Sequence, residues 1–371
     1  MTDVDTAHLA TRVLWAAFGL SLLFGFIAHR SRFCTMGAIA DVVSMGHWER
    51  ARMWALAVAV ATLGFNGMVA LGWVEARNAI YAMPRLLWLS ALAGGGLFGF
   101  GMVLASGCGS RNLVRLGGGN LKSLVVLIVM AVTAFATLKG LTAVLRVATV
   151  ERLFVDLPTG QDLPSLLAGG GLGSVPQLAV ALGAAVAVLL GGWALWRPEG
   201  RSPAALLGGL GIGAVITGVW WVSGVLGFVP EDPQTLEPAF LATNSHRMEA
   251  LSMASPLAYA LDWLLFFSDS SKTLTLGIVS VAGVPLGAAA SALLQRSFRW
   301  EGFGNVQDLA LHLVGASLMG VGGVVAMGCT IGQGISGLST LSLGSLLAVA
   351  GIVAGGLLGL RYQTWRIERM D

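Results

Sequence analysis

The chain has 371 residues, of which 56% are hydrophobic and only 11% are charged. A soluble domain carries about 25% charged residues, so this composition indicates a polytopic membrane protein and excludes an ordinary soluble domain. The net charge of +3 is too small and too scattered for a nucleic-acid partner. The three cysteines form no CxxC pair, which argues against a disulfide framework or a zinc ribbon. We expect neither a metal site nor a cofactor.

The apolar runs of the sequence predict an all-α protein with about nine transmembrane helices, since each span needs roughly 20 apolar residues. Asp3 and Asp5 stand where a cleavable signal would carry Lys or Arg, so the first run is predicted to be a retained span. The predicted spans cover residues 12–30, 52–74, 86–106, 123–146, 176–196, 203–227, 273–295, 308–327 and 343–361.

Four segments between these spans are too short or too polar to cross the bilayer, namely residues 34–47, 108–121, 240–267 and 329–342. Backbone that does not span is tolerated at membrane depth only when it is buried in protein or lines a wet cavity. We therefore predict four short re-entrant elements. For residues 240–267 an ordinary extramembrane loop is the alternative.

The distribution of basic residues predicts the orientation in the membrane. With nine spans, the loops after spans one, three, five and seven share a side with the C-terminus, and they carry most of the Lys and Arg residues. By the positive-inside rule this side is cytoplasmic. The prediction is an N-terminus outside and a C-terminus inside.

An internal repeat relates Gly94–Ser123 to Gly315–Ser345. Aligned on Cys108 and Cys329, the glycines at 94, 99, 101 and 107 fall on those at 315, 320, 322 and 328, and after one inserted residue Ser123 meets Ser345. The linker near 200–209 then divides the chain into two half-repeats, residues 1–198 and 199–371. A weaker match places Gly227 opposite Cys34. Interrupted apolar segments at matching positions point to inverted halves with a transport site between them.

All three cysteines, Cys34, Cys108 and Cys329, lie in breaks between apolar segments. A lone membrane cysteine is usually a small buried hydrophobe, but three at helix breaks favour a substrate pathway. A neutral thiol suits a soft solute that contains sulfur or selenium, whereas a thiolate site would suit a soft metal such as Cu(I). Glycines flank the breaks, and we expect them to supply positive φ and close backbone approach. These glycines are Gly37, Gly107, Gly109, Gly328 and Gly332.

Short helices that begin at the cysteines would direct free N–H groups into one cavity. A helix N-terminus carries roughly +0.5 charge, so such a cavity would favour an anion without a buried Lys or Arg. Arg32 and His29, which flank Cys34, are candidates for attracting that anion, and the alternative for them is simple anchoring at the membrane surface. Because Cys108 and Cys329 are equivalent in the repeat, we expect them near the midplane and Cys34 nearer one mouth.

Three stretches, FCTMGAIADVVSMGHWERARMW, SGCGSRNLVRLGGGNLKSLVV and MGCTIGQGISGLSTLSLGSL, resemble the signature stretches of the YeeE/YedE family of membrane sulfur transporters. The resemblance implies thiosulfate uptake across the bacterial inner membrane by an hourglass-shaped protein with nine spans. It also implies that Cys34, Cys108 and Cys329 line the path and pass the ion along through S–H contacts. A cytoplasmic TusA-like sulfur carrier is the implied partner. Some relatives act in selenium metabolism, so a selenium compound stays an alternative substrate.

The resemblance assigns no chemistry to two stretches of additional length, residues 147–175 and 228–260. A transporter rather than an enzyme is the favoured interpretation, and no nucleotide-binding P-loop occurs. The alternative is a membrane sulfurtransferase that carries sulfane sulfur as a cysteine persulfide. That chemistry needs an activated thiolate, yet of the three cysteines only Cys34 has a histidine nearby.

Overall fold

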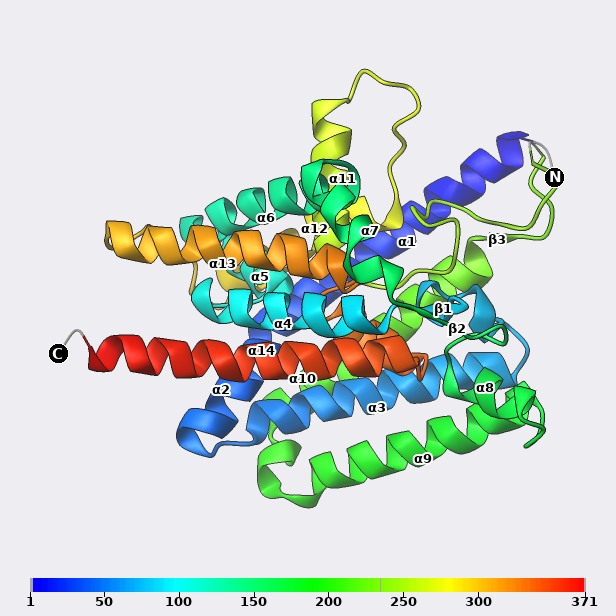
Figure 1. Ribbon diagram of the computed structural model, residues 1–371, viewed down its shortest axis with the longest axis horizontal. Helices are drawn as coiled ribbons and strands as arrows, with labels where there is room; N and C mark the ends of the chain where they lie inside the picture. The colour runs from blue at the N-terminus through cyan, green and yellow to red at the C-terminus, as the bar shows by residue number, and fades with distance from the viewer. Residues whose placement is uncertain (1–2, 234, 370–371) are drawn as a thin grey trace.

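The computed structural model describes residues 3–233 and 235–369. Within these ranges nine helices are long and apolar enough to cross a membrane, which confirms the prediction of an all-α multi-pass protein. Figure 1 shows most of them running side by side along the long axis. The nine helices are α1 (Asp3–Arg30), α3 (Glu49–Ala70), α4 (Trp88–Leu104), α6 (Leu121–Lys139), α9 (Val175–Trp196), α10 (Pro203–Trp221), α12 (Leu276–Leu294), α13 (Val306–Val325) and α14 (Leu343–Glu368).

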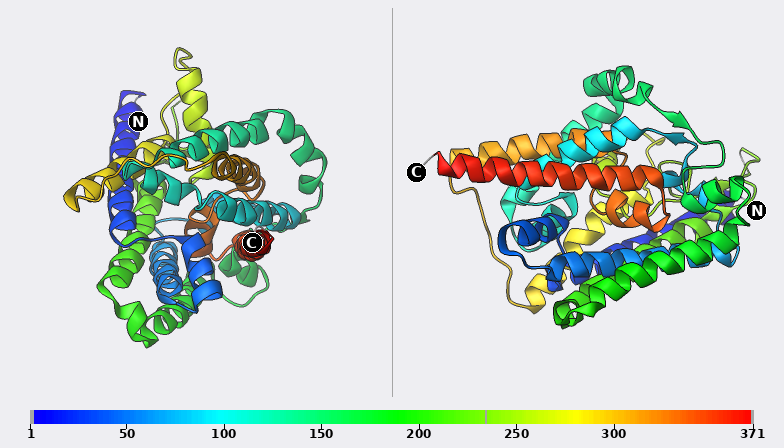
Figure 2. Two further views of the ribbon diagram at one scale, coloured as in Figure 1. Left: turned by 90° about the vertical axis from the view of Figure 1, so that its left-hand side faces the viewer. Right: turned by 60° about the horizontal axis from the view of Figure 1, so that its bottom comes forward.

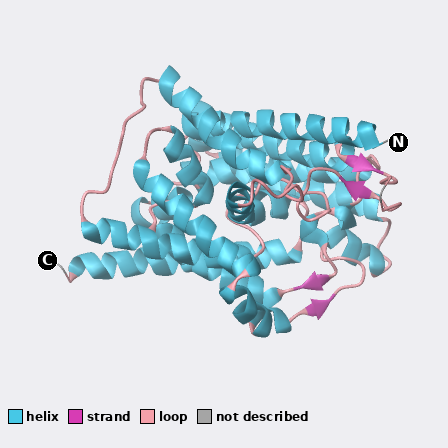
Figure 3. Ribbon diagram, turned by 90° about the horizontal axis from the view of Figure 1, so that it is seen from above, coloured by secondary structure: helices cyan, strands magenta, loops and turns pink. Residues whose placement is uncertain are grey.

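Shorter elements connect these helices. The short α-helices are α2 (Thr35–Met45), α5 (Gly109–Gly117), α7 (Leu141–Ala148), α8 (Leu163–Gly169) and α11 (Ala254–Leu265). Single turns of 3₁₀ helix are η1 (Ala76–Asn78), η2 (Ile80–Ala82), η3 (Val150–Arg152) and η4 (Pro198–Arg201), and π-turns are η5 (Val222–Leu226) and η6 (Gly332–Gly337). Two antiparallel pairs, β1 (Arg85–Leu86) with β2 (Val155–Asp156) and β3 (Phe228–Val229) with β4 (Ala239–Phe240), lie at the N-terminal end of the molecule (Figure 3).

Helices α4 and α13 cross so closely that their glycine backbones touch. A Cβ atom on Gly94 would lie 2.8 Å from the carbonyl oxygen of Gly322, and one on Gly315 would lie 2.6 Å from that of Gly101. In the aligned repeats Gly94 corresponds to Gly315 and Gly101 to Gly322, so this is one contact made twice with the roles exchanged. Such reciprocity is typical of a two-fold axis. The pairing is antiparallel, so one repeat is inverted relative to the other.

The neighbours of these two helices follow the same relation. Helix α14 packs along α4 as α6 packs along α13, and α10 packs on α3 as α1 packs on α12. Helix α9 packs on α3 outside these pairs. The left panel of Figure 2 shows α13 and α14 end on, with α4, which packs on both, between them. The boundary between the half-repeats at residues 198 and 199 stays a prediction.

The weak match of Gly227 to Cys34 does not extend to the local backbone. Helix α10 passes into the π-turn η5, and Gly227 follows with a φ of −87°. The chain then enters β3 rather than a short helix. At the corresponding place in the first half, Cys34 directly precedes the 11-residue helix α2.

Candidate substrate pathway

The same kind of helix end precedes each of the three cysteines. In each case a long helix ends in a left-handed residue two positions before the cysteine, and the next N–H donates back five residues along the chain. The left-handed residues are Arg32 (φ 56°), Ser106 (φ 55°) and Met327 (φ 56°). The closing bonds are Phe33 N to Ala28 O at 3.0 Å, Gly107 N to Met102 O at 2.8 Å and Gly328 N to Gly323 O at 2.8 Å. This is the Schellman helix end, which sharply redirects the chain.

Positive φ at residues other than glycine is uncommon and costs about 1–2 kcal/mol. Its recurrence at all three cysteine breaks indicates that each break is held by the surrounding structure. The prediction that the flanking glycines supply the positive φ is therefore wrong, because that conformation falls on Arg32, Ser106 and Met327 instead.

The flanking glycines act through close packing, the second role expected of them. A Cβ atom on Gly37 would lie 2.6 Å from Arg50 Nη1, and one on Gly332 would lie 2.6 Å from Ser252 Oγ. The corresponding distances are 3.0 Å from Gly107 to Arg111 Cγ, 3.0 Å from Gly328 to Gln333 Cγ and 3.2 Å from Gly109 to Met130 Cε. Because each glycine lacks a Cβ atom, the side chain that lies against it can approach the cysteine break closely.

Backbone N–H groups donate to two of the three sulfur atoms. Gly37 N donates to Cys34 Sγ at 3.2 Å, and Gly332 N donates to Cys329 Sγ at 3.4 Å, in each case from three residues ahead. Cys108 Sγ lies 3.2 Å from Ser110 Oγ. Sulfur is a weak acceptor, but each N–H that it accepts leaves the thiol proton directed elsewhere. The arrangement therefore suits a thiol that donates its proton to a ligand.

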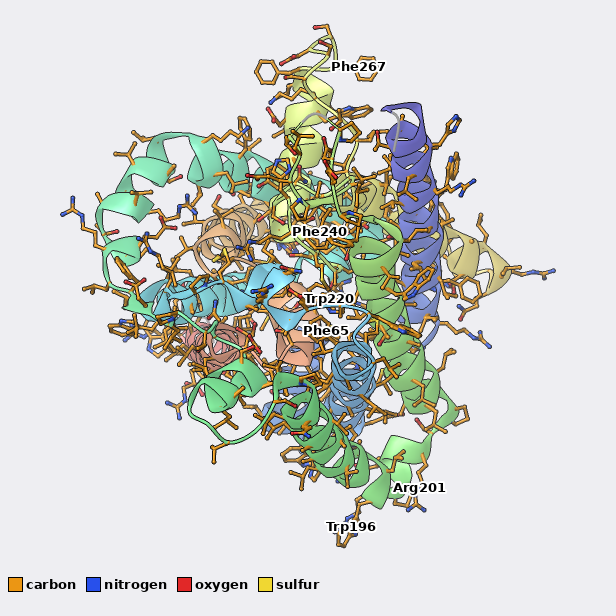
Figure 4. The ribbon with its side chains drawn as sticks, turned by 90° about the vertical axis from the view of Figure 1, so that its right-hand side faces the viewer. Phe65, Trp196, Arg201, Trp220, Phe240 and Phe267 are labelled. Carbon is orange, nitrogen blue, oxygen red and sulfur yellow. The ribbon has the colours of Figure 1, made fainter. Side chains whose placement is uncertain are left out.

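Burial differs among the three thiols. Cys108 and Cys329 are 1% and 0% exposed, whereas Cys34 is partly exposed. This difference fits the expectation that Cys34 lies nearer one mouth. Around the central pair the packing is apolar and tight, because both belong to the main buried cluster. Figure 4 shows two other members of that cluster, Phe65 and Trp220, near the centre of the molecule.

Among the described residues, Arg111 and Arg50 lie close enough to the Cys34 thiol to interact with it electrostatically. Arg50 also pairs with Asp41 at 3.1 Å, and Arg111 packs against Gly107. Sequence reasoning had selected Arg32 and His29 for this role. Arg32 is exposed, and His29 Nδ1 lies 3.0 Å from the hydroxyl of Ser291 on α12.

The segment predicted as residues 240–267 proves to have two parts, an irregular stretch over 241–253 and helix α11. The irregular stretch is not an ordinary surface loop, because Met248, Leu251 and Met253 are at most 1% exposed. Met253 N donates to Cys329 Sγ at 3.3 Å, and Leu251 O accepts from Ser336 Oγ at 2.8 Å. Sequence reasoning assigned no chemistry to this stretch, yet it contacts the third cysteine directly.

Buried hydroxyl groups accompany the thiols. Thr330 follows Cys329 and Thr35 follows Cys34, and the hydroxyls of both threonines are buried without a hydrogen-bond partner among the described residues. In the middle, Ser110 supplies the hydroxyl next to Cys108. A soft sulfur donor and a hard oxygen donor therefore stand together at each break.

A cavity of about 30 Å³ lies against the Cys329 break. Met327 and Gln333, from either side of Cys329, form part of its wall, together with Tyr81 and Arg85. Gln333 is held by two bonds, from its Nε2 to Ala326 O at 2.6 Å and from Ser345 Oγ to its Oε1 at 2.6 Å. The Cys329 break thus lies next to a polar chamber, and Cys34 lies near the two arginines Arg50 and Arg111.

Comparison with known proteins identifies the family. The sequence model of a family described as sulphur transport matches residues 30–358. The thiosulfate transporter TsuA of Escherichia coli K12 is 26% identical over 84% of each chain, and that of Spirochaeta thermophila is 26% identical over 92% of this chain and 97% of its own. The probable transporter YedE of Escherichia coli K12 is 34% identical over 27% of this chain and 24% of its own. The chain therefore belongs to the sulphur-transport family, the YeeE/YedE family indicated by its cysteine motifs.

Proposed function

We propose that this protein carries thiosulfate across the bacterial inner membrane, along a path that passes Cys329, Cys108 and Cys34 in turn. The observation that carries the proposal is the same backbone break repeated at all three cysteines, with N–H groups donating to the sulfur at Cys34 and Cys329. The choice of substrate rests on the two relatives of nearly full length that are named thiosulfate transporters.

The donors along the path match the two ends of a thiosulfate ion. Its terminal sulfur is soft and polarisable, and the thiol protons suit it, while its oxygens are hard acceptors suited to hydroxyl and backbone donors. Each hydrogen bond contributes about 0.5–1.5 kcal/mol net, so no single position holds the ion tightly. Weak binding at successive positions lets an ion enter and leave a pathway.

Helix ends supply the compensating positive potential. Helices α2 and α5 begin directly after Cys34 and Cys108, and an N-terminus carries roughly +0.5 charge. Full positive charges lie at both ends of the path, Arg111 and Arg50 at the Cys34 end and Arg85 in the wall of the cavity beside Cys329.

We infer that the Cys34 end faces the cytoplasm, with the N-terminus outside and the C-terminus inside. The excess of Lys and Arg in the loops on the C-terminal side supports this orientation. Uptake then runs from the cavity beside Cys329 to the arginines beside Cys34. A cytoplasmic TusA-like sulfur carrier would receive the ion at that end.

The test is uptake of labelled thiosulfate by purified protein in liposomes, compared with growth of a strain that lacks other routes for sulfate and thiosulfate. The chain is expected to restore growth on thiosulfate and to load the vesicles with the intact ion. Empty vesicles and vesicles with the Cys329→Ala variant are the controls. The proposal fails if neither growth nor vesicle uptake exceeds these controls at matched protein levels.

A further inference from the structure

Two of the membrane-spanning helices begin side by side at the cavity next to Cys329. Helices α4 and α14 run parallel, since Gly95 lies against Ala348 and Val103 lies against Gly359 further along both helices. Their N-terminal turns form much of the cavity wall, with Leu87, Ser90 and Ala91 from α4 and Ser342, Gly344 and Ser345 from α14. Two helix N-termini therefore direct their positive ends at one small chamber.

Two buried hydroxyls in this wall have no hydrogen-bond partner among the described residues, those of Ser90 and Ser342. Each serine is only 1% exposed. Ser342 stands at the N-cap of α14, where a serine side chain ordinarily accepts from the backbone, but it makes no such bond. The first N–H groups of that helix go to Gln161 instead, from Leu343 to its carbonyl oxygen and from Gly344 to its Oε1. A buried hydroxyl without a partner in the protein is free to donate its proton to a ligand.

The equivalent helix ends on the other side of the repeat are already satisfied. There α6 and α13 begin, and Asn120, which corresponds to Ser342, accepts from Ser123 N at 2.9 Å. The first turn of α13 holds Asp308, whose carboxylate pairs with Lys122 at 2.7 Å. Neither α4 nor α14 has an acidic residue in its first turn. An acidic side chain thus lies within the first turn of α13 but not within the first turn of α4 or α14.

We propose that the chamber formed by the N-termini of α4 and α14 is an oxyanion-binding site, in which Ser90 and Ser342 donate their hydroxyl protons to the oxygens of a tetrahedral sulfur oxyanion. The inference rests on the proposed function, and it adds the site at which the transported ion first binds. With its oxygens against the serines, thiosulfate directs its terminal sulfur towards the Cys329 break, because Met327 and Gln333, which precede and follow Cys329 in the sequence, line the cavity. Arg85 lines the same chamber and is exposed, and it pairs with Asp156 at 3.6 Å.

Two acids stand close to the chamber, Asp162 next to Ser342 and Asp156, which pairs with Arg85 at 3.6 Å. The cavity of about 30 Å³ holds more than a single water, which needs about 10–15 Å³. Asp162 forms an isolated bridge with Ser342, and its Oδ2 accepts from Ser165 N at 3.0 Å, which caps α8. Burial raises the pKa of Asp162, so its carboxyl group opposes a nearby anion less than an exposed carboxylate would.

The test measures equilibrium binding of labelled thiosulfate and of labelled sulfate to the purified full chain, without any flux. Sulfate has the oxygens of the ion but lacks its terminal sulfur, so it probes the oxyanion site alone. The Ser90→Ala/Ser342→Ala double variant is expected to lose about tenfold or more in affinity for both anions. The Cys329→Ala variant should keep its affinity for sulfate. Ser317→Ala is the matched control, because the hydroxyl of Ser317 is satisfied by Leu313 O within α13.

A second variant separates lost binding from lost folding. Ser342→Asp places a carboxylate at the start of α14, as Asp308 does near the start of α13, so it should raise the melting temperature while it abolishes sulfate binding. Unchanged sulfate affinity in the double alanine variant overturns the inference, and so does a wild-type chain that binds neither anion. Sulfate binding that is sensitive to the serines, in a chain that moves no thiosulfate, would instead overturn the proposed function and leave the oxyanion site standing.

Discussion

The backbone N–H of Met253 donates to the sulfur of Cys329 across 3.3 Å, although 76 positions separate the two residues in the sequence. The bond joins the irregular stretch 241–253 to the proposed substrate pathway. This stretch passes the cysteine break at a second point, where Ser252 lies against Gly332. The position of the Cys329 thiol therefore depends on a segment far away in the chain.

Gly332→Ala tests this dependence. The added Cβ would lie 2.6 Å from Ser252 Oγ and 3.0 Å from Ser252 Cβ, so Ser252 and the neighbouring Met253 N–H must shift. We expect thiosulfate uptake to fall several-fold while the protein stays folded, as measured by vesicle uptake and a melting curve. Gly192→Ala is the control, because nothing lies within 4 Å of a Cβ at that helical position. Equal uptake by the two variants would show that the stretch does not position the thiol.

The three cysteines should differ in importance. Cys108→Ala and Cys329→Ala each remove a thiol that is buried in the protein. If the charge of the thiosulfate ion is left without that donor, the loss of free energy is larger than the contribution of one hydrogen bond. We expect both variants to abolish uptake at normal membrane levels, and serine to rescue poorly because its shorter, harder hydroxyl suits sulfur less well.

Cys34→Ala should reduce uptake less, because Cys34 is partly exposed and water can replace the lost thiol. Vesicle uptake of all three alanine variants at matched expression gives the comparison. If Cys108→Ala kept the full wild-type rate, the cysteines would be small buried hydrophobes rather than parts of a pathway.

The hydroxyl beside Cys329 offers a separate test. Thr330→Val preserves the shape of the side chain and removes only a buried hydroxyl without a hydrogen-bond partner among the described residues. In the folded protein without substrate the change should be neutral or slightly stabilising. We expect it to raise the KM for thiosulfate about tenfold, while Thr330→Ser stays close to wild type. Unchanged kinetics in Thr330→Val together with a lower melting temperature would point to a purely structural hydroxyl.

The apolar runs and the glycine pattern were sufficient to predict the fold. Every predicted span corresponds to a long helix, because bilayer thickness sets the length of an apolar run directly. The glycine alignment also gave the correct relation between α4 and α13, since only glycine permits the contacts of Gly94 with Gly322 and Gly315 with Gly101.

Two features of the candidate site could not be predicted from the sequence, each for a physical reason. Positive φ fell on Arg32, Ser106 and Met327, because tertiary packing can hold a residue with a side chain in a conformation that local preference assigns to glycine. The approach of Met253 to Cys329 and of Arg50 to Cys34 depends on contacts between distant segments. No local pattern encodes such contacts.

The last prediction concerns the arginines at the Cys34 end. Arg111, which belongs to α5 and is half-buried, interacts electrostatically with the Cys34 thiol. Arg32 is closer to Cys34 in the sequence, but its side chain is exposed. Salt screens exposed charges, with a Debye length of about 8 Å at physiological ionic strength, but it screens buried charges much less. We therefore expect Arg111→Gln to lower the maximal uptake rate about tenfold at both low and high salt. Arg32→Gln should change uptake by less than about twofold, and only at low salt.

Vesicle uptake at two salt concentrations distinguishes the roles of the two arginines. Arg115→Gln is an informative third variant, because Arg115 Nη1 donates to Ser106 O at 2.8 Å and so supports the Cys108 break rather than the Cys34 end. Its loss should lower the melting temperature as well as the rate, whereas Arg111→Gln should lower the rate alone. A larger loss of uptake in Arg32→Gln than in Arg111→Gln would reverse the assignment and place the attracting charge at the exposed residue.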